Sequence, residues 1–203
     1  MNLFVSMLAS SALQLVVFNV IPFVWWLVTA RNEVNFFEWI GLKKVQSDDK
    51  PNLLRMIALV SVVYLLVALF MLYLVRGAQT ATSVFEGQGW RALPAGLVYA
   101  FLNTALPEEM LFRGFLLKRL AAKVGGLKAN FIQALLFGLL HGLMFYKAVG
   151  FGAVVAIVIF TGSIGWFMGY INEEAAGGSI LPSWLIHGIS NTFSAILAMF
   201  SMI

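Results

Sequence analysis

Long apolar stretches follow one another along nearly the whole chain. The two clearest cover residues 4–30 and 56–75, which contain no charged residue. Three further stretches cover residues 129–146, 148–171 and 179–203. A helix of about twenty apolar residues, rising about 1.5 Å per residue, spans the roughly 30 Å hydrocarbon core of a bilayer. These stretches therefore predict transmembrane helices.

A sixth passage, residues 92–117, mixes apolar and charged positions. Residues 92–106 are apolar, Pro107, Glu108 and Glu109 interrupt them, and apolar residues resume as far as residue 117. Proline lacks a backbone N–H and clashes with the preceding turn, so it kinks or breaks a helix. We therefore expect an all-α, polytopic transmembrane bundle of about six spanning helices, one of them kinked or broken at Pro107. The whole chain, residues 1–203, is expected to form a single membrane-embedded domain.

Composition and charge support this interpretation. The chain is 61% hydrophobic and only 11% charged, which is too apolar for a soluble domain. Residues 31–55 hold five Lys or Arg residues and residues 118–128 hold four. Short basic loops remain cytoplasmic, so both loops are expected on that side and both termini on the other. The net charge of +4 is thus explained by topology and does not indicate a nucleic-acid partner.

Two other features bear on packing and on metal binding. Gly138 with Gly142, and Gly165 with Gly169, are pairs of small residues four positions apart that allow close contact between helices. The chain has no cysteine, which excludes disulfides and thiolate metal sites.

The ionisable side chains inside apolar passages are the candidates for chemistry. They include both histidines of the chain, and the full set is Glu108, Glu109, Arg113, His141 and His187. Ionisable groups in a spanning helix cost several kcal/mol unless they are paired, and they often mark functional sites.

Spacing along a helix sorts these side chains, because residues four apart share a face whereas neighbours diverge by about 100°. Glu109 can pair with Arg113, which leaves Glu108 pointing elsewhere, free to act as a base. Asn191 shares a helix face with His187, and Phe137 precedes His141 by one turn.

Depth along the helices gives a second argument. Counted from the expected cytoplasmic ends at about 1.5 Å per residue, Glu108, His141 and His187 lie roughly 12–18 Å deep. They fall in one layer of the bilayer although they come from separate helices, so a shared pocket is geometrically possible.

The ordered set of motifs resembles the signature of the CAAX protease and bacteriocin-processing family of intramembrane endopeptidases. The motifs lie within residues 108–191 and read Glu108-Glu109-x-x-x-Arg113, Phe137-x-x-x-His141 and His187-x-x-x-Asn191. This family includes the type II CAAX prenyl endopeptidases and many bacterial relatives. The resemblance implies a multi-pass protein of a bacterial or archaeal cell membrane.

The resemblance also implies roles for these residues. Glu108 would activate water with the help of His141, and His187 with Asn191 would stabilise the oxyanion. Glu109 would join them as a candidate catalytic residue, forming an ion pair with the supporting residue Arg113, while Phe137 would contribute packing. We expect no cofactor and no metal, because Asn191 suits an oxyanion donor better than a zinc ligand. The alternative is zinc held by Glu108, His141 and His187.

The expected activity is endoproteolysis of a peptide or protein that enters from the bilayer or the cytosol, near the end of its chain. Membrane lipids are the other expected partners, and no nucleic acid is. The sequence leaves two alternatives open. One is a non-catalytic immunity or interaction protein that binds a bacteriocin or another membrane protein, and the other is a proton-coupled transporter.

Overall fold

The computed structural model describes residues 2–75 and 77–202. Arg76, which follows the second apolar stretch, lies outside the described residues. Within the described ranges every regular element is a helix and no strand occurs, which confirms the predicted all-α class.

Four helices are long and apolar enough to cross a membrane. They are α1 (Leu3–Thr29), α3 (Lys50–Leu74), α7 (Gly126–Phe145) and α8 (Phe151–Tyr170), the last continued by a π-helical turn, Ile171–Ala175. The other two expected passages are also helical but carry more polar residues: a composite helix from Leu93 to Val124 and α9 (Leu181–Met199). By length and composition, four of the six expected passages qualify as membrane spans, so the predicted number of six spanning helices is approximate. Short helices α2 (Phe36–Trp39), Ser83–Phe85 and Gly89–Ala92 lie in the connections.

The composite helix is continuous through Pro107 and is not broken there. It consists of α4 (Leu93–Val98), a π-helical segment (Tyr99–Ala105), α5 (Leu106–Glu109), a second π-helical segment (Met110–Leu117) and α6 (Lys118–Val124). Before the proline, the N–H of Leu106 bonds to the carbonyl of Phe101, five residues earlier. This wider turn gives room to the carbonyl that a proline ring would otherwise strike, so the helix absorbs Pro107 without ending.

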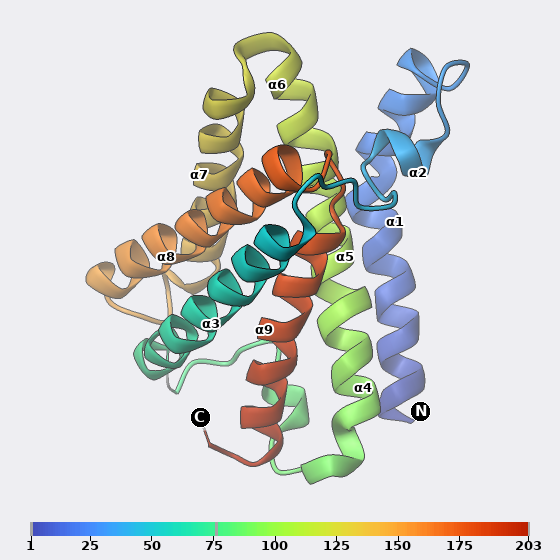
Figure 1. Ribbon diagram of the computed structural model, residues 1–203. Helices are drawn as coiled ribbons and strands as arrows, with labels where there is room; N and C mark the ends of the chain where they lie inside the picture. The colour runs from blue at the N-terminus through green and yellow to red at the C-terminus, as the bar shows by residue number, and fades with distance from the viewer. Residues whose placement is uncertain (1, 76, 203) are drawn as a thin grey trace.

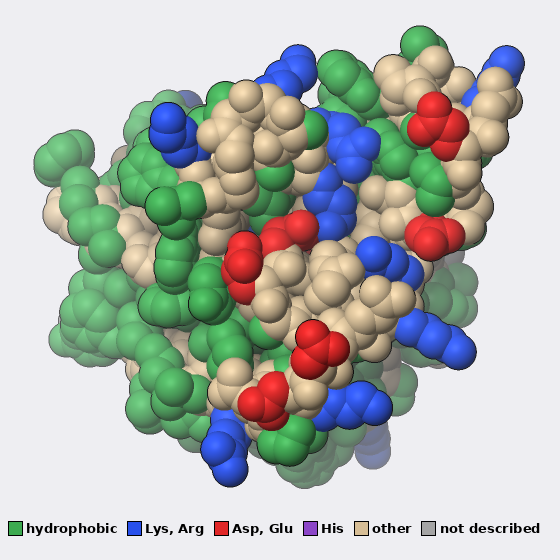
Figure 2. Space-filling model, turned by 45° about the horizontal axis from the view of Figure 1, so that its top comes forward, with side chains coloured by type: hydrophobic (Ala, Val, Ile, Leu, Met, Phe, Trp, Pro, Cys, Tyr) green, Lys and Arg blue, Asp and Glu red, His purple; other side chains and the backbone are tan. Residues whose placement is uncertain are grey.

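The composite helix lies between α1 and α9 (Figure 1). Helices α7 and α8 lie on the side of the bundle away from α1, and α3 crosses near α9. Both termini lie at the lower end of this view, and the turn between α6 and α7 lies at the upper end together with α2. The two basic loops are thus at one end of the bundle and the termini at the other, as the charge pattern predicts. Figure 2 shows Lys and Arg side chains spread over that end of the molecule, interspersed with Asp and Glu side chains.

The start of α9 is fixed by polar contacts at this same end. Asn172 donates to the hydroxyl of Ser183 at 2.7 Å and accepts from the Ser183 backbone N–H at 3.2 Å. Nearby, the ammonium of Lys118 lies 2.5 Å from the Glu173 carboxylate. Burial lowers the pKa of Lys118, and the Glu173 carboxylate opposes this shift. These contacts hold α9 in register with the composite helix, which carries the two glutamates.

Close contact between α7 and α8 depends on glycine. A Cβ atom on Gly138 would run into the carbonyl oxygen of Val158 and would come within 3.1 Å of the Gly162 nitrogen. The first of the two predicted glycine pairs therefore lies at a helix crossing, as expected for small residues in membrane proteins.

We expect Gly138→Ala to destabilise the bundle, because the added methyl group forces α7 and α8 apart. The expected loss is about 1–3 kcal/mol of unfolding free energy, measured by thermal or denaturant unfolding in detergent. Gly152→Ala is the matched control, since no described atom outside its chain neighbours and its own helix backbone lies within 4 Å of its Cβ position. Equal unfolding midpoints for the two variants would contradict the close crossing.

Candidate active site

One cavity of about 240 Å³ is lined by four of the five candidate catalytic side chains, and Glu109 does not line it. Its lining includes Glu108 from the composite helix, His141 from α7, and His187 and Asn191 from α9. Residues of α3 and α8 complete the wall, among them Tyr64 and Thr161. Four side chains from three separate helices thus face one space, which agrees with their similar expected depth in the bilayer.

Glu109 lies behind this cavity in a buried charge network. Its Oε1 atom is 3.1 Å from Nη1 of Arg113, and both side chains are 0% exposed. The same oxygen lies 2.9 Å from Nδ1 of His187 on α9. The predicted Glu109–Arg113 pair is therefore present, and it extends across to a second helix.

Glu109 also fixes how His187 is presented. A carboxylate can only accept, so Nδ1 of His187 donates to Glu109 and the other ring nitrogen, Nε2, is left for the cavity. Nε2 lies 3.9 Å from Oε2 of Glu108, too far for a direct hydrogen bond. A separation of this size suits two groups that share a water molecule.

Glu108 differs sharply from its neighbour. Its side chain is 20% exposed, toward the cavity. Among the described residues, Oε2 is buried without a hydrogen-bond partner in both glutamates, but Oε1 of Glu109 contacts Arg113 and His187, whereas Glu108 has no such cation. A buried carboxylate oxygen without a hydrogen-bond partner raises the free energy of the folded state. The two adjacent glutamates thus face different surroundings, as their helical spacing predicted.

His141 is oriented by its own helix. Its Nδ1 lies 2.9 Å from the carbonyl oxygen of Phe137, and because a carbonyl only accepts, Nδ1 carries the proton. In the neutral ring, Nε2 is then a free acceptor. The Phe137 ring lies 4.4 Å from the His141 ring and 4.3 Å from the guanidinium carbon of Arg113. Phe137 therefore packs between the His141 ring and the Arg113 guanidinium, and its supporting role stays a prediction.

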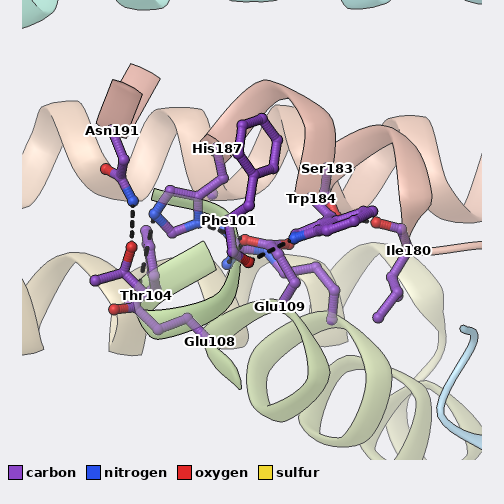
Figure 3. A network of polar contacts seen from close by, with 12 residues as sticks. Phe101, Thr104, Glu108, Glu109, Ile180, Ser183, Trp184, His187 and Asn191 are labelled. Atoms are coloured by element: carbon purple, nitrogen blue, oxygen red, sulfur yellow. Dashed lines mark hydrogen bonds and ion pairs between the residues drawn. The ribbon is translucent and has the colours of Figure 1, made fainter. Parts of the chain in front are cut away.

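Asn191 is held by a residue that the motifs did not single out. Its amide donates to the hydroxyl of Thr104 at 2.6 Å (Figure 3). Thr104 precedes Glu108 by one helical turn, so the four-residue spacing could have placed it on the same face. Further polar residues of the lining, Tyr64, Tyr99 and Ser190, gave no signal in the sequence because they belong to no motif.

The residues present do not form a recognisable metal site. In the part of the chain that the structure describes, no three His, Asp or Glu side chains are grouped so that they could hold a metal ion. Glu108, His141 and His187, the alternative zinc ligands, line one cavity without such grouping. The metal-free site and the zinc site both stay predictions.

A family model described as type II CAAX prenyl endopeptidase Rce1-like matches residues 89–193, more than half of the chain. The chain belongs to this family. The match contains all seven candidate site residues of the three motifs. Membership indicates a CAAX-type intramembrane protease activity, and the four apolar helices make the chain an integral membrane protein. No curated protein and no solved structure matches the chain.

The buried charge network makes a prediction about stability. Arg113→Gln leaves the Glu109 carboxylate buried without its cation, and we expect a loss of about 3–5 kcal/mol of unfolding free energy. In Glu109→Gln/Arg113→Gln the uncompensated charge is gone, so the double variant should lose less than the sum of the two single variants. Unfolding in detergent measures all three. Arg55→Gln, a change at an exposed position of α3, is the control, and additive losses would show that the pair is not coupled.

Proposed function

We propose that the chain is an intramembrane endopeptidase in which Glu108 activates the attacking water. The observation that carries this proposal is the unpaired Oε2 of Glu108 in the cavity that it shares with two imidazoles and an amide. A general base must reach the proton that it removes, and a carboxylate already paired with a cation is a weaker base. Glu109 is paired in this way, whereas Glu108 is available.

The first step is attack on the substrate carbonyl. Glu108 takes a proton from water, and the hydroxide oxygen forms a bond to the carbonyl carbon while the C=O π electrons move to the oxygen. His141, whose Nδ1–H is held by Phe137, offers the free Nε2 as an acceptor that orients the water. The product of this step is a tetrahedral intermediate with an oxyanion.

The oxyanion needs donors that are already in place, because such preorganised donors supply a large part of enzymatic rate acceleration. Asn191 supplies the amide N–H that Thr104 does not use. His187, when it carries both ring protons, supplies Nε2–H, since Glu109 holds Nδ1–H. Glu109 and Arg113 thus act through His187 and do not touch the substrate.

The second step breaks the peptide bond. The protonated Glu108 gives its proton to the amide nitrogen, the C–N bond breaks, and the electron pair of the oxyanion re-forms the carbonyl. The products are a carboxylic acid and an amine, and Glu108 returns to its ionised form. One water molecule is consumed and no other reactant is required.

The substrate that we propose is a peptide or protein whose end reaches the cavity from the bilayer or the cytosol. The name of the family denotes prenylated CAAX sequences, so a synthetic farnesylated CAAX peptide is the first probe to use. Mass spectrometry of membrane peptides, from cells with and without the active chain, tests substrates outside that class. We place the chain in a bacterial or archaeal cell membrane, with lipids as its other partners.

Glu108→Gln should reduce hydrolysis by about 10²–10⁴-fold, because the amide cannot accept the proton from water. The change is nearly isosteric, so the unfolding midpoint should stay close to that of the unchanged chain. Hydrolysis of the probe peptide and the membrane-peptide comparison both measure this effect. Glu174→Gln, a change of the same kind outside the cavity, should retain full activity. Full activity of purified Glu108→Gln would refute the role of Glu108 as the base. If Glu108→Gln hydrolyses no peptide yet protects cells from a bacteriocin as well as the unchanged chain does, hydrolysis is not the mechanism of protection and a binding protein is favoured.

Chelators provide a separate test of the metal-free mechanism. We expect 1,10-phenanthroline and EDTA to leave the rate of peptide hydrolysis unchanged, because the proposed steps use only side chains and water. Metal analysis of the purified protein is the control that detects bound zinc. Loss of activity with chelator, followed by recovery on adding zinc, would instead support Glu108, His141 and His187 as ligands.

A further inference from the structure

Thr104 connects the composite helix to the proposed oxyanion donor on α9. Its hydroxyl oxygen accepts a hydrogen bond from Nδ2 of Asn191 at 2.6 Å, although the two residues are far apart in the sequence. Figure 3 shows Thr104 and Asn191 facing each other beside His187 and Glu108. Thr104, Glu108 and Asn191 all line the same cavity.

The hydroxyl proton of Thr104 is already used elsewhere. The hydroxyl donates it to backbone carbonyls of its own helix: Oγ1 lies 3.1 Å from the Tyr99 oxygen and 3.3 Å from the Ala100 oxygen. Within this π-helical segment the backbone N–H groups bond five residues back, so the regular four-residue pairing of these carbonyls is disturbed and the hydroxyl can bond to them. The oxygen of Thr104 is therefore an acceptor toward Asn191.

This arrangement decides which way the Asn191 amide points. The flipped amide would place Oδ1 against an oxygen whose proton is already donated, and two acceptors would repel each other. Thr104 thus selects the orientation in which nitrogen faces it. One N–H is used in that contact, and the second N–H of the same nitrogen remains for a ligand.

We propose that Thr104 is a positioning residue that holds the Asn191 amide in the orientation needed to donate to the oxyanion. This inference rests on the proposed peptidase function for its effect on rate. It assigns a role to a residue outside the three motifs. It also explains how the donor on α9 keeps its place relative to Glu108: Thr104 and Glu108 lie one turn apart on a single helix, so one rigid element fixes both the base and the donor.

The first test measures the contact without any catalysis. In protein labelled with ¹⁵N in the asparagine side chains, the Asn191 amide resonance is assigned by its loss in Asn191→Ala. We expect Thr104→Val to shift this resonance and to speed hydrogen exchange of the amide about tenfold, because a typical hydrogen bond is lost. Thr104→Ser retains the hydroxyl and should behave as the unchanged chain. If Thr104→Val does not fold, Thr104→Ala replaces it in the same comparison.

Thr192→Val is the matched control. Thr192 lies next to Asn191 on α9 and its hydroxyl donates to the Gly188 carbonyl at 2.7 Å, so this change removes a hydroxyl of the same type without touching the amide of Asn191. An Asn191 resonance and exchange rate that do not change in Thr104→Val would overturn the proposed contact. The same changes in Thr192→Val would also overturn it, because the effect would then not be specific to Thr104.

The second test measures the consequence for hydrolysis. On whichever peptide the chain cleaves, Thr104→Val should lower kcat about tenfold with KM unchanged, and Thr104→Ser should restore the rate. In an Asn191→Ala background, Thr104→Val should cause no further loss, because its effect passes through the amide. An equal loss in both backgrounds would overturn the positioning role. A chain that hydrolyses no peptide at all would refute the proposed function instead, and the amide measurements would still decide the contact.

Discussion

The buried guanidinium of Arg113 is the constraint on which the arrangement of the site depends. A cation with 0% exposed surface inside an apolar bundle is stable only where its partners are fixed around it. Glu109 supplies the opposite charge and the Phe137 ring on α7 covers the guanidinium face. On α8, a Cβ at Gly165 would lie 2.9 Å from Nη2, so glycine provides the space. Because Glu109 also binds His187, one charge fixes the relative positions of the composite helix, α7, α8 and α9.

The π-helical geometry of the composite helix has a second consequence for the site. Pro107 would be expected to end a regular helix, yet the wider turns on either side keep the chain helical through it. Glu108 and Glu109 consequently lie on a rigid helix and project in directions that differ by about 100°. One carboxylate faces the cavity and the other faces Arg113. A flexible loop with the same two residues would let them exchange partners, and the distinction between the cavity-facing carboxylate and the paired one would be lost.

The sequence predicts those features that depend on local periodicity. Apolar length indicates spanning helices, and the four-residue spacing of Glu109 and Arg113 indicates their ion pair. Continuity at Pro107 could not be predicted, because it depends on hydrogen bonds to carbonyls five residues back. The convergence of the candidate site side chains on one cavity was only partly predictable. Counting residues gives the depth of each side chain in the bilayer, but not the direction in which its helix face points. Tyr64 illustrates this limit: it joins the cavity from α3 through tertiary packing alone.

Hydrolysis inside a bilayer requires groups that are both fixed and able to exchange a proton. Three of the four candidate catalytic side chains that line the cavity are held by a hydrogen bond on an atom that would not face the substrate. His141 is held by the Phe137 carbonyl, His187 by Glu109, and Asn191 by Thr104. The Nε2 atom of each histidine and the second amide N–H of Asn191 are thereby oriented toward the cavity without further loss of conformational entropy. Electrostatic interactions of these groups are strong where water is largely excluded. Glu108 has no such anchor on its Oε2 among the described residues. Among the four candidate catalytic side chains that line the cavity, the one without such an anchor is thus the group to which the proposed mechanism assigns proton transfer with water.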